Sequence, residues 1–133
     1  MKTTALIEKG KDGTFGIFTP DIESTIIGEG KTVAEAKADF ENSVREVSAM
    51  FEEMGRPLPE ELRGLEFEYK WDIASLFDYF SWINVSKLAT AIGITPSLMR
   101  YYKKKGAYIS DAQARRIEDG LHRVADELKA ISF

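Results

Sequence analysis

The chain has 133 residues, of which 44% are hydrophobic and 30% charged, so it suits one globular domain or two very small ones. It has no cysteine and a single histidine, His122, which excludes disulfide scaffolds, thiol nucleophiles and zinc sites built on sulfur or on several histidines. The net charge of −4 is divided unevenly, because residues 1–83 hold nine basic and 17 acidic residues and residues 84–133 hold nine basic and five acidic ones. This division indicates two surfaces with different partners, the alternative being chance clustering on one solvated surface.

Three short strands are predicted at the start of the chain, over residues 3–9, 14–18 and 24–28. Asp12 and Gly13 separate the first two strands. This pair supports the positive φ angles of a tight hairpin turn, so we expect the first two strands to pair in an antiparallel manner.

A long helix is predicted to begin after Thr32, which forms a capping box with Glu35, and to end at Gly55 and Pro57. Apolar residues recur along it every three or four positions, as one helical stripe requires. The stripe consists of Val33, Ala36, Phe40, Val44, Val47, Phe51 and Met54.

Residues 65–71 alternate strictly between apolar and charged side chains, which predicts a strand with one buried face. Residues 1–71 are therefore expected to form an α+β domain in two layers, a small antiparallel sheet with one long helix.

Residues 72–133 are predicted to form an all-helical domain, with helices over 73–83, 85–92 and 96–104. Asp72, Asn84 and Thr95 stand at the positions expected to cap these three helices. A last helix is predicted to begin after Ser110, which forms a second capping box with Gln113. Its apolar stripe suits either a core face or a seam between two chains. The stripe consists of Ala114, Ile117, Leu121, Val124, Leu128 and Ile131.

Nothing in the sequence predicts catalysis, and we expect neither an enzyme nor a cofactor. Asp12, Asp21 and Glu23 lie near strand ends, where metal-dependent nucleases hold ions, but turn formation explains the first two. The lone His122 is more simply a solvated or hydrogen-bonded side chain than a catalytic base. No apolar run approaches the roughly 20 residues of a membrane-spanning helix, and no secretory signal is recognisable, so we expect a cytoplasmic protein without membrane contact.

The segment 85–104 has the pattern of a helix-turn-helix. Gly93 permits the sharp turn, while Leu88 and Ala89 before it and Ile94, Leu98 and Met99 after it are expected to pack inward. Arg100 is suited to bidentate contact with guanine, and the lysines that follow it are suited to phosphate. The alternative is a solvated lysine run that closes one helix of an ordinary bundle. The candidate DNA-binding residues are Thr95, Ser97, Arg100, Tyr101, Lys103, Lys104 and Lys105.

Residues 3–62 resemble the HicB antitoxin domain, also called a partial RNase H fold. The features that carry the resemblance are a first strand ending in Ile7-Glu8, the pairs Asp12-Gly13 and Pro20-Asp21, the run from Gly30 to Ala36, and the exit through Pro57 and Pro59. Residues 84–121 are similar to the lambda-repressor-like helix-turn-helix that some of these antitoxins carry.

The resemblance implies an antitoxin of a toxin–antitoxin pair that masks a HicA-type RNA-cleaving toxin and represses its own operon by binding operator DNA as a homodimer or higher homo-oligomer. It places Asp21 and Glu23 in a loop expected to meet the toxin. The alternative function is a stand-alone transcriptional regulator whose N-terminal domain senses a ligand or only dimerises.

Overall fold

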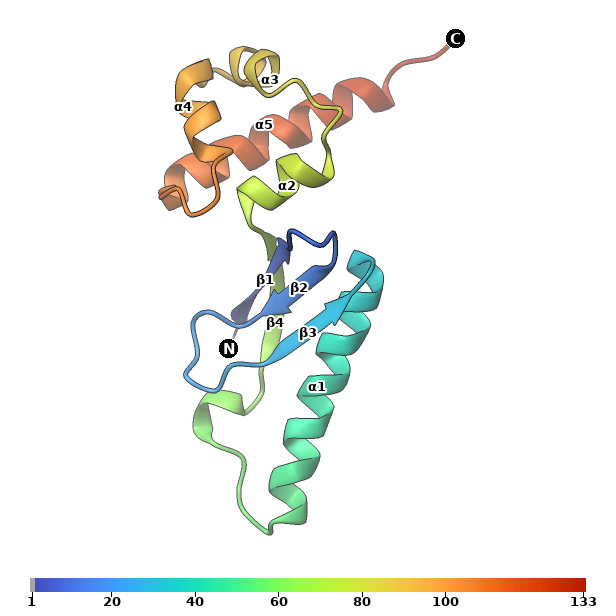
Figure 1. The fold of residues 1–133 in the computed structure, drawn as a ribbon, viewed down its shortest axis with the longest axis vertical. Coiled ribbons are helices and arrows are strands. Elements are labelled where there is room, and N and C mark those ends of the chain that lie inside the picture. Colours follow the sequence, from blue (N-terminus) through green and yellow to red (C-terminus); the bar gives the residue numbers. More distant parts are fainter. Residues whose placement is uncertain (1) are drawn as a thin grey trace. The chain divides into compact units, whose positions relative to one another are not determined.

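The computed structural model describes residues 2–133, which form two compact units, one ending at Leu76 and one spanning Phe77–Phe133 (Figure 1). The fold is α+β: a mixed four-stranded sheet with one long helix, followed by a region of four helices. The boundary lies within the first of those helices, a few residues beyond the expected division after residue 71. The elements are β1 (Lys2–Lys9), β2 (Phe15–Phe18), β3 (Ile27–Gly30), α1 (Val33–Glu53), the short 3-10 helix η1 (Glu60–Leu62), β4 (Glu66–Trp71), α2 (Ile73–Tyr79), α3 (Val85–Ile92), α4 (Pro96–Tyr102) and α5 (Asp111–Lys129).

The sheet has the strand order β3-β2-β1-β4, and it is mixed rather than antiparallel. The pairs β1–β2 and β2–β3 are antiparallel, as expected, but β4 runs parallel to β1, so the prediction of an antiparallel sheet was wrong at this strand. The reason is the connection through α1. This helix returns the chain to the end of the sheet where β1 begins, and a strand that starts there runs parallel to β1. Alternation of apolar residues reveals a buried face but not a strand direction.

The core of the first unit lies between α1 and one face of the sheet (Figure 1). On the helix, Ala36 and Phe40 are completely buried. The Phe40 ring packs edge-on against Phe67 at 5.0 Å and against Tyr69 at 6.1 Å between ring centroids. The alternation predicted for β4 is confirmed, because its odd-numbered residues pack against this core and its even-numbered residues are exposed.

Gly28 lets α1 approach β3 closely. A Cβ atom at this position would lie 2.3 Å from the backbone nitrogen of Phe40, a distance that real Cβ atoms do not adopt. The sequence marked Gly28 only as the end of a strand, whereas in the structure it sets the separation between helix and sheet.

Local signals placed most helix starts correctly. The Glu35 backbone N–H donates to the Thr32 hydroxyl at 3.0 Å, and the Glu35 carboxylate accepts from the Lys31 N–H at 2.9 Å. The bounds of three elements differ from those predicted: the third strand covers Ile27–Gly30 rather than residues 24–28, α2 ends at Tyr79 rather than residue 83, and α4 ends at Tyr102 rather than residue 104. The strand starts late because the loop before it is bonded elsewhere, with the Ser24 N–H donating to the Glu61 carboxylate at 3.1 Å.

Candidate nucleic-acid interface

α3 and α4 are joined by the tight glycine turn that the sequence predicted. Gly93 adopts φ of 79°, in the left-handed region that favours glycine, and the Ile94 N–H donates back to the Ala89 carbonyl at 2.9 Å. At the other end of α3, the Lys87 N–H donates to the Asn84 side chain at 3.0 Å, which confirms that cap. The turn therefore stops α3 abruptly and starts α4 in a new direction.

A small apolar core holds the two helices against α5. Ile94 and Met99 are buried, as expected, whereas Leu98 is only half-buried. Tyr102, which the sequence did not single out, is also buried, and its hydroxyl accepts from the Gln113 side chain of α5 at 3.3 Å. The core of this unit comprises Phe77, Val85, Leu88, Ala89, Ile92, Ile94, Met99, Tyr102 and Ile117.

Two arginines of α5 fix the end of α3 and the turn. Arg116 donates to the Gly93 carbonyl at 2.6 Å, and Arg123 donates to the Ala91 carbonyl at 3.1 Å. These bonds satisfy carbonyl groups that the end of a helix leaves without partners. Sequence reasoning missed both roles, although the two arginines are seven residues apart, a spacing that places them on one face of α5.

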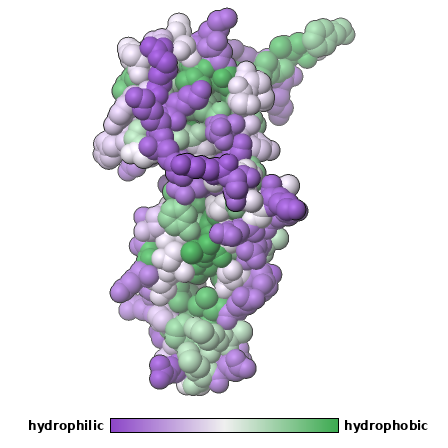
Figure 2. Space-filling model, viewed as in Figure 1, coloured by the Kyte–Doolittle hydropathy of each residue, from purple (hydrophilic) through white to green (hydrophobic). Residues whose placement is uncertain are grey.

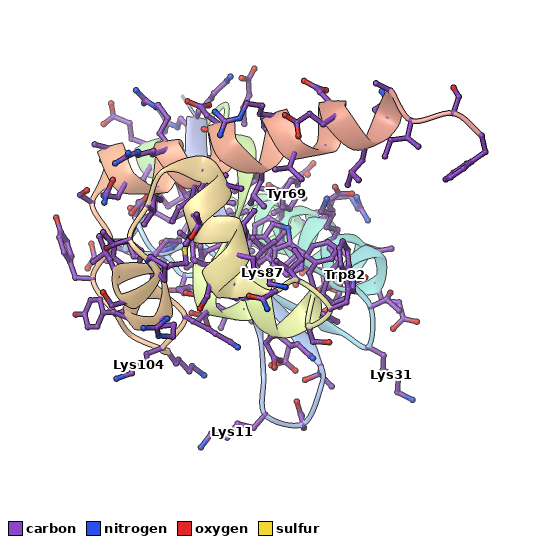
Figure 3. All side chains as sticks on the ribbon, turned by 90° about the horizontal axis from the view of Figure 1, so that it is seen from above. Lys11, Lys31, Tyr69, Trp82, Lys87 and Lys104 are labelled. Atoms are coloured by element: carbon purple, nitrogen blue, oxygen red, sulfur yellow. The ribbon has the colours of Figure 1, made fainter. Side chains whose placement is uncertain are left out.

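All seven predicted DNA-binding side chains are exposed. Ser97, Arg100 and Tyr101 lie on α4, and Tyr101 is 47% exposed. The three lysines follow the helix, and Lys104 extends clear of the ribbon (Figure 3). Thr95 precedes α4, but its side chain makes no cap hydrogen bond, so the cap expected of it was wrong; Pro96 follows at the first helical position.

Arg100 also contacts α3. Its Nη1 donates to the Ser86 hydroxyl at 3.0 Å, so the guanidinium is held where α4 passes the first turn of α3. Arginine has five N–H donors, and this bond uses only one of them. The remaining donors are available to an acceptor outside the protein.

The charge around α3 and α4 has one sign. Between Asn84 and Ser110 the sequence contains five basic residues and no acidic one, a local signal stronger than the division of charge along the whole chain. The acidic residues of the second unit lie on α2 and α5 instead. The segment that contains α3 and α4 therefore carries no carboxylate of its own that would repel a polyanion. The basic residues are Lys87, Arg100, Lys103, Lys104 and Lys105.

The apolar stripe of α5 is only partly used for the core. Ile117 is buried and Val124 is half-buried, whereas Leu128 is 56% exposed and Ile131, beyond the helix, is 55% exposed. Figure 2 shows the apolar C-terminal end standing clear of the other side chains of this unit. The first half of the stripe is thus core, and the second half is uncovered.

The acidic candidates of the first unit lie on the surface. Asp21 and Glu23 are exposed in the loop between β2 and β3. Glu61 anchors this loop, and hydrogen bonds from the Ser24 side chain and from backbone N–H groups lower the pKa of the Glu61 carboxyl. Asp12 serves its own turn, since hydrogen bonds from the Thr14 hydroxyl and backbone lower the pKa of its carboxyl. Within residues 2–133 no three acidic or histidine side chains gather in a way that suits a metal ion.

No protein-family model, curated protein or solved structure matches this chain. The similarity to the HicB antitoxins therefore stays a prediction from residue patterns. In the part of the chain that the structure describes, no helix is both long and apolar enough to cross a membrane.

Proposed function

We propose that this protein is a DNA-binding antitoxin of the HicB type. In this proposal the second unit binds operator DNA through α4, and the first unit binds and masks a basic, HicA-type toxin that cleaves RNA. The observation that carries the proposal is the exposed face of α4. It holds Ser97, Arg100 and Tyr101, is continued by three lysines, and rests on a helix-turn-helix whose core is buried.

The dimensions of α4 suit the major groove of DNA. An α-helix with its side chains is about 10–12 Å across, and the groove is about 12 Å wide, so the seven residues of α4 can enter it. Side chains on the exposed face of α4 would meet base edges, with Arg100 contacting guanine or a phosphate beside it. Lys103–Lys105 would neutralise phosphates. A two-fold dimer would place two such helices about one helical turn of DNA apart.

The charge of the first unit supports a basic protein partner. Up to Leu76 the chain has nine basic and 16 acidic residues, whereas the second unit has nine basic and six acidic ones. An RNA-cleaving toxin needs a basic surface to hold its substrate, so an acidic antitoxin would be steered toward that surface and would compete with RNA for it.

The DNA-binding part is tested with the full-length protein and a DNA fragment from upstream of its own gene. Arg100→Ala is expected to weaken binding by roughly 1–3 kcal/mol, measured by fluorescence anisotropy. Lys70→Ala is the matched control, because Lys70 is equally cationic and exposed but lies on β4 of the first unit. Equal affinity of Arg100→Ala and the wild type would remove α4 from the DNA-binding surface.

The toxin-binding part is tested by producing the protein together with the product of the short reading frame next to its gene. A stable complex that suppresses the RNA cleavage of that product is expected. A neighbour that cleaves RNA equally well in the presence of this protein would refute the masking role and favour a stand-alone regulator.

A further inference from the structure

The face of the sheet opposite α1 carries a row of apolar side chains. Leu6 on β1 pairs with Phe18 on β2, which pairs with Ile27 on β3, so the three side chains lie side by side on one face. This face is not the one that packs against α1, whose β1 residues are Ala5 and Ile7. Ile27 is 54% exposed, and the other two are half-buried. The row is therefore a small apolar surface outside the core.

Acidic residues border this row at one end of the sheet. On β4, Glu66 and Glu68 are exposed and belong to the same face as the row, because they pair with Lys2 and Thr4 of β1. Parallel pairing of β4 with β1 is what brings these two glutamates to the end where β1 begins.

The loop that contains Asp21 and Glu23 leaves β2 at this same end, directly after the Leu6–Phe18 pair. Lys2 and Lys70 also belong to this face, but by the same register so do Glu8 and Glu29, so four glutamates outnumber two lysines on the strands even without the loop. Protein-binding surfaces commonly have an apolar centre that loses water on binding and a polar or charged rim, and the apolar row with its acidic border has this arrangement.

We infer that this sheet face, with Leu6, Phe18, Ile27, Glu66 and Glu68, together with Asp21 and Glu23 in the loop at its end, is the docking site for a basic protein partner. The inference rests on the proposed function and assigns the toxin to this surface. Charge complementarity selects the occupant, because the acidic border repels nucleic acid and would also repel the same face of a second copy. The apolar row supplies the contact area, and the carboxylates orient a cationic rim of the partner.

The test uses the full-length protein and the purified product of the adjacent reading frame, with affinity measured by isothermal titration calorimetry. Ile27→Asp is expected to weaken binding at least about tenfold, as loss of a central interface contact does. Its matched control is Met50→Asp, since Met50 is 46% exposed but lies on α1. Glu68→Lys is expected to weaken binding more at low salt than at high salt, whereas the control Glu52→Lys on α1 leaves the affinity within about twofold of the wild type.

The outcomes separate the two proposals. If the wild type binds the neighbour and both sheet variants bind it as tightly as their controls do, the docking site is wrong and the antitoxin function stands. If the wild type does not bind the neighbour, the masking function itself fails. If Ile27→Asp lowers the sedimentation mass of the protein alone, a second copy occupies the face, which also overturns the inference. A cooperative thermal unfolding transition shows that each variant is folded. If Ile27→Asp is not folded, Glu68→Lys still tests whether the partner binds this sheet face.

Discussion

Replacing Gly120 by alanine sets two physical effects against each other, and the structure predicts which one is larger. Gly120 is buried in α5 where this helix crosses α3. Alanine is the better helix former by about 1 kcal/mol, so propensity alone predicts a more stable protein. A Cβ atom at position 120, however, would lie 2.6 Å from Cγ2 and 2.7 Å from Cβ of Ile92.

The contact with Ile92 should outweigh the gain in propensity. Its Cβ is bonded directly to the α3 backbone, so no rotation of the side chain relieves the overlap and the two helices must separate. Overpacking of this kind costs about 1–3 kcal/mol, and separation also strains the Arg116 and Arg123 hydrogen bonds to the end of α3. If overpacking costs the upper value of about 3 kcal/mol and alanine regains about 1 kcal/mol of helix propensity, the net destabilisation is about 2 kcal/mol. This loss lowers the unfolding midpoint by about 8–16 °C in a unit of this size.

The assay is thermal unfolding of the full-length protein, followed by circular dichroism, together with binding to the upstream DNA fragment. The matched variant is Ala125→Gly, an exposed position on the same helix, which should lose only the propensity difference of about 1 kcal/mol. Because the α3–α5 contact supports α4, which carries the proposed DNA-binding surface, Gly120→Ala is also expected to weaken DNA binding, whereas Ala125→Gly is not. A midpoint that rises in Gly120→Ala would refute the reasoning and the close approach of α3 to α5.

Three further predictions concern the sheet, the half-buried phenol of Tyr69 and the three lysines after α4. Gly28→Ala should destabilise the first unit by about 1–3 kcal/mol, because its Cβ overlaps the backbone of α1. The control is Gly16→Ala in the same sheet, whose added Cβ meets nothing within 4 Å. Denaturant unfolding compares the two variants, and equal unfolding midpoints would contradict the close packing of α1 on β3. Burial, and then the hydrogen bond to Glu41, raise the pKa of Tyr69 from 10.0 to about 12, so its contribution to stability is complete below pH 10 and is lost as pH rises toward 12. Between pH 10 and pH 12 the free energy of unfolding should fall less steeply with pH in Tyr69→Phe than in the wild type. An equal slope in the two proteins would refute the raised pKa of Tyr69. Changing any one of Lys103–Lys105 to alanine should reduce the salt dependence of DNA binding by about one phosphate contact without changing sequence preference, as measured by titrations at several salt concentrations.

Features that depend on neighbours in the sequence were predictable. The hydrogen bonds to the side chains of Thr32, Asn84 and Ser110 join residues three positions apart, so the residue types alone indicated them. The same holds for the turn at Gly93, whose positive φ follows from glycine's lack of a Cβ. The exposure of the α4 residues also followed from helical periodicity once the apolar anchors were identified.

Features that depend on distant residues were not predictable from the pattern. In the sequence Tyr102 stands between exposed Tyr101 and three exposed lysines, yet its side chain is buried and accepts a hydrogen bond from Gln113 of α5. Likewise, the sequence around Arg116 indicates only a surface charge, whereas in the structure its side chain donates to the Gly93 carbonyl after α3. In both cases the partner is more than ten residues away, so nothing in the local sequence identifies it.

The sequence by itself determined the caps at Thr32, Asn84 and Ser110, the turn at Gly93, the apolar stripes and the division into an acidic and a basic part, because each depends on residue type and on spacing of a few positions. The tertiary structure decided that β4 runs parallel to β1, and through this pairing it brought Glu66 and Glu68 to the same end of the sheet as Asp21 and Glu23. The direction of a strand is set by the path of the chain that leads to it, and here that path is the long helix α1, whose packing on the sheet requires contacts between residues far apart in the sequence.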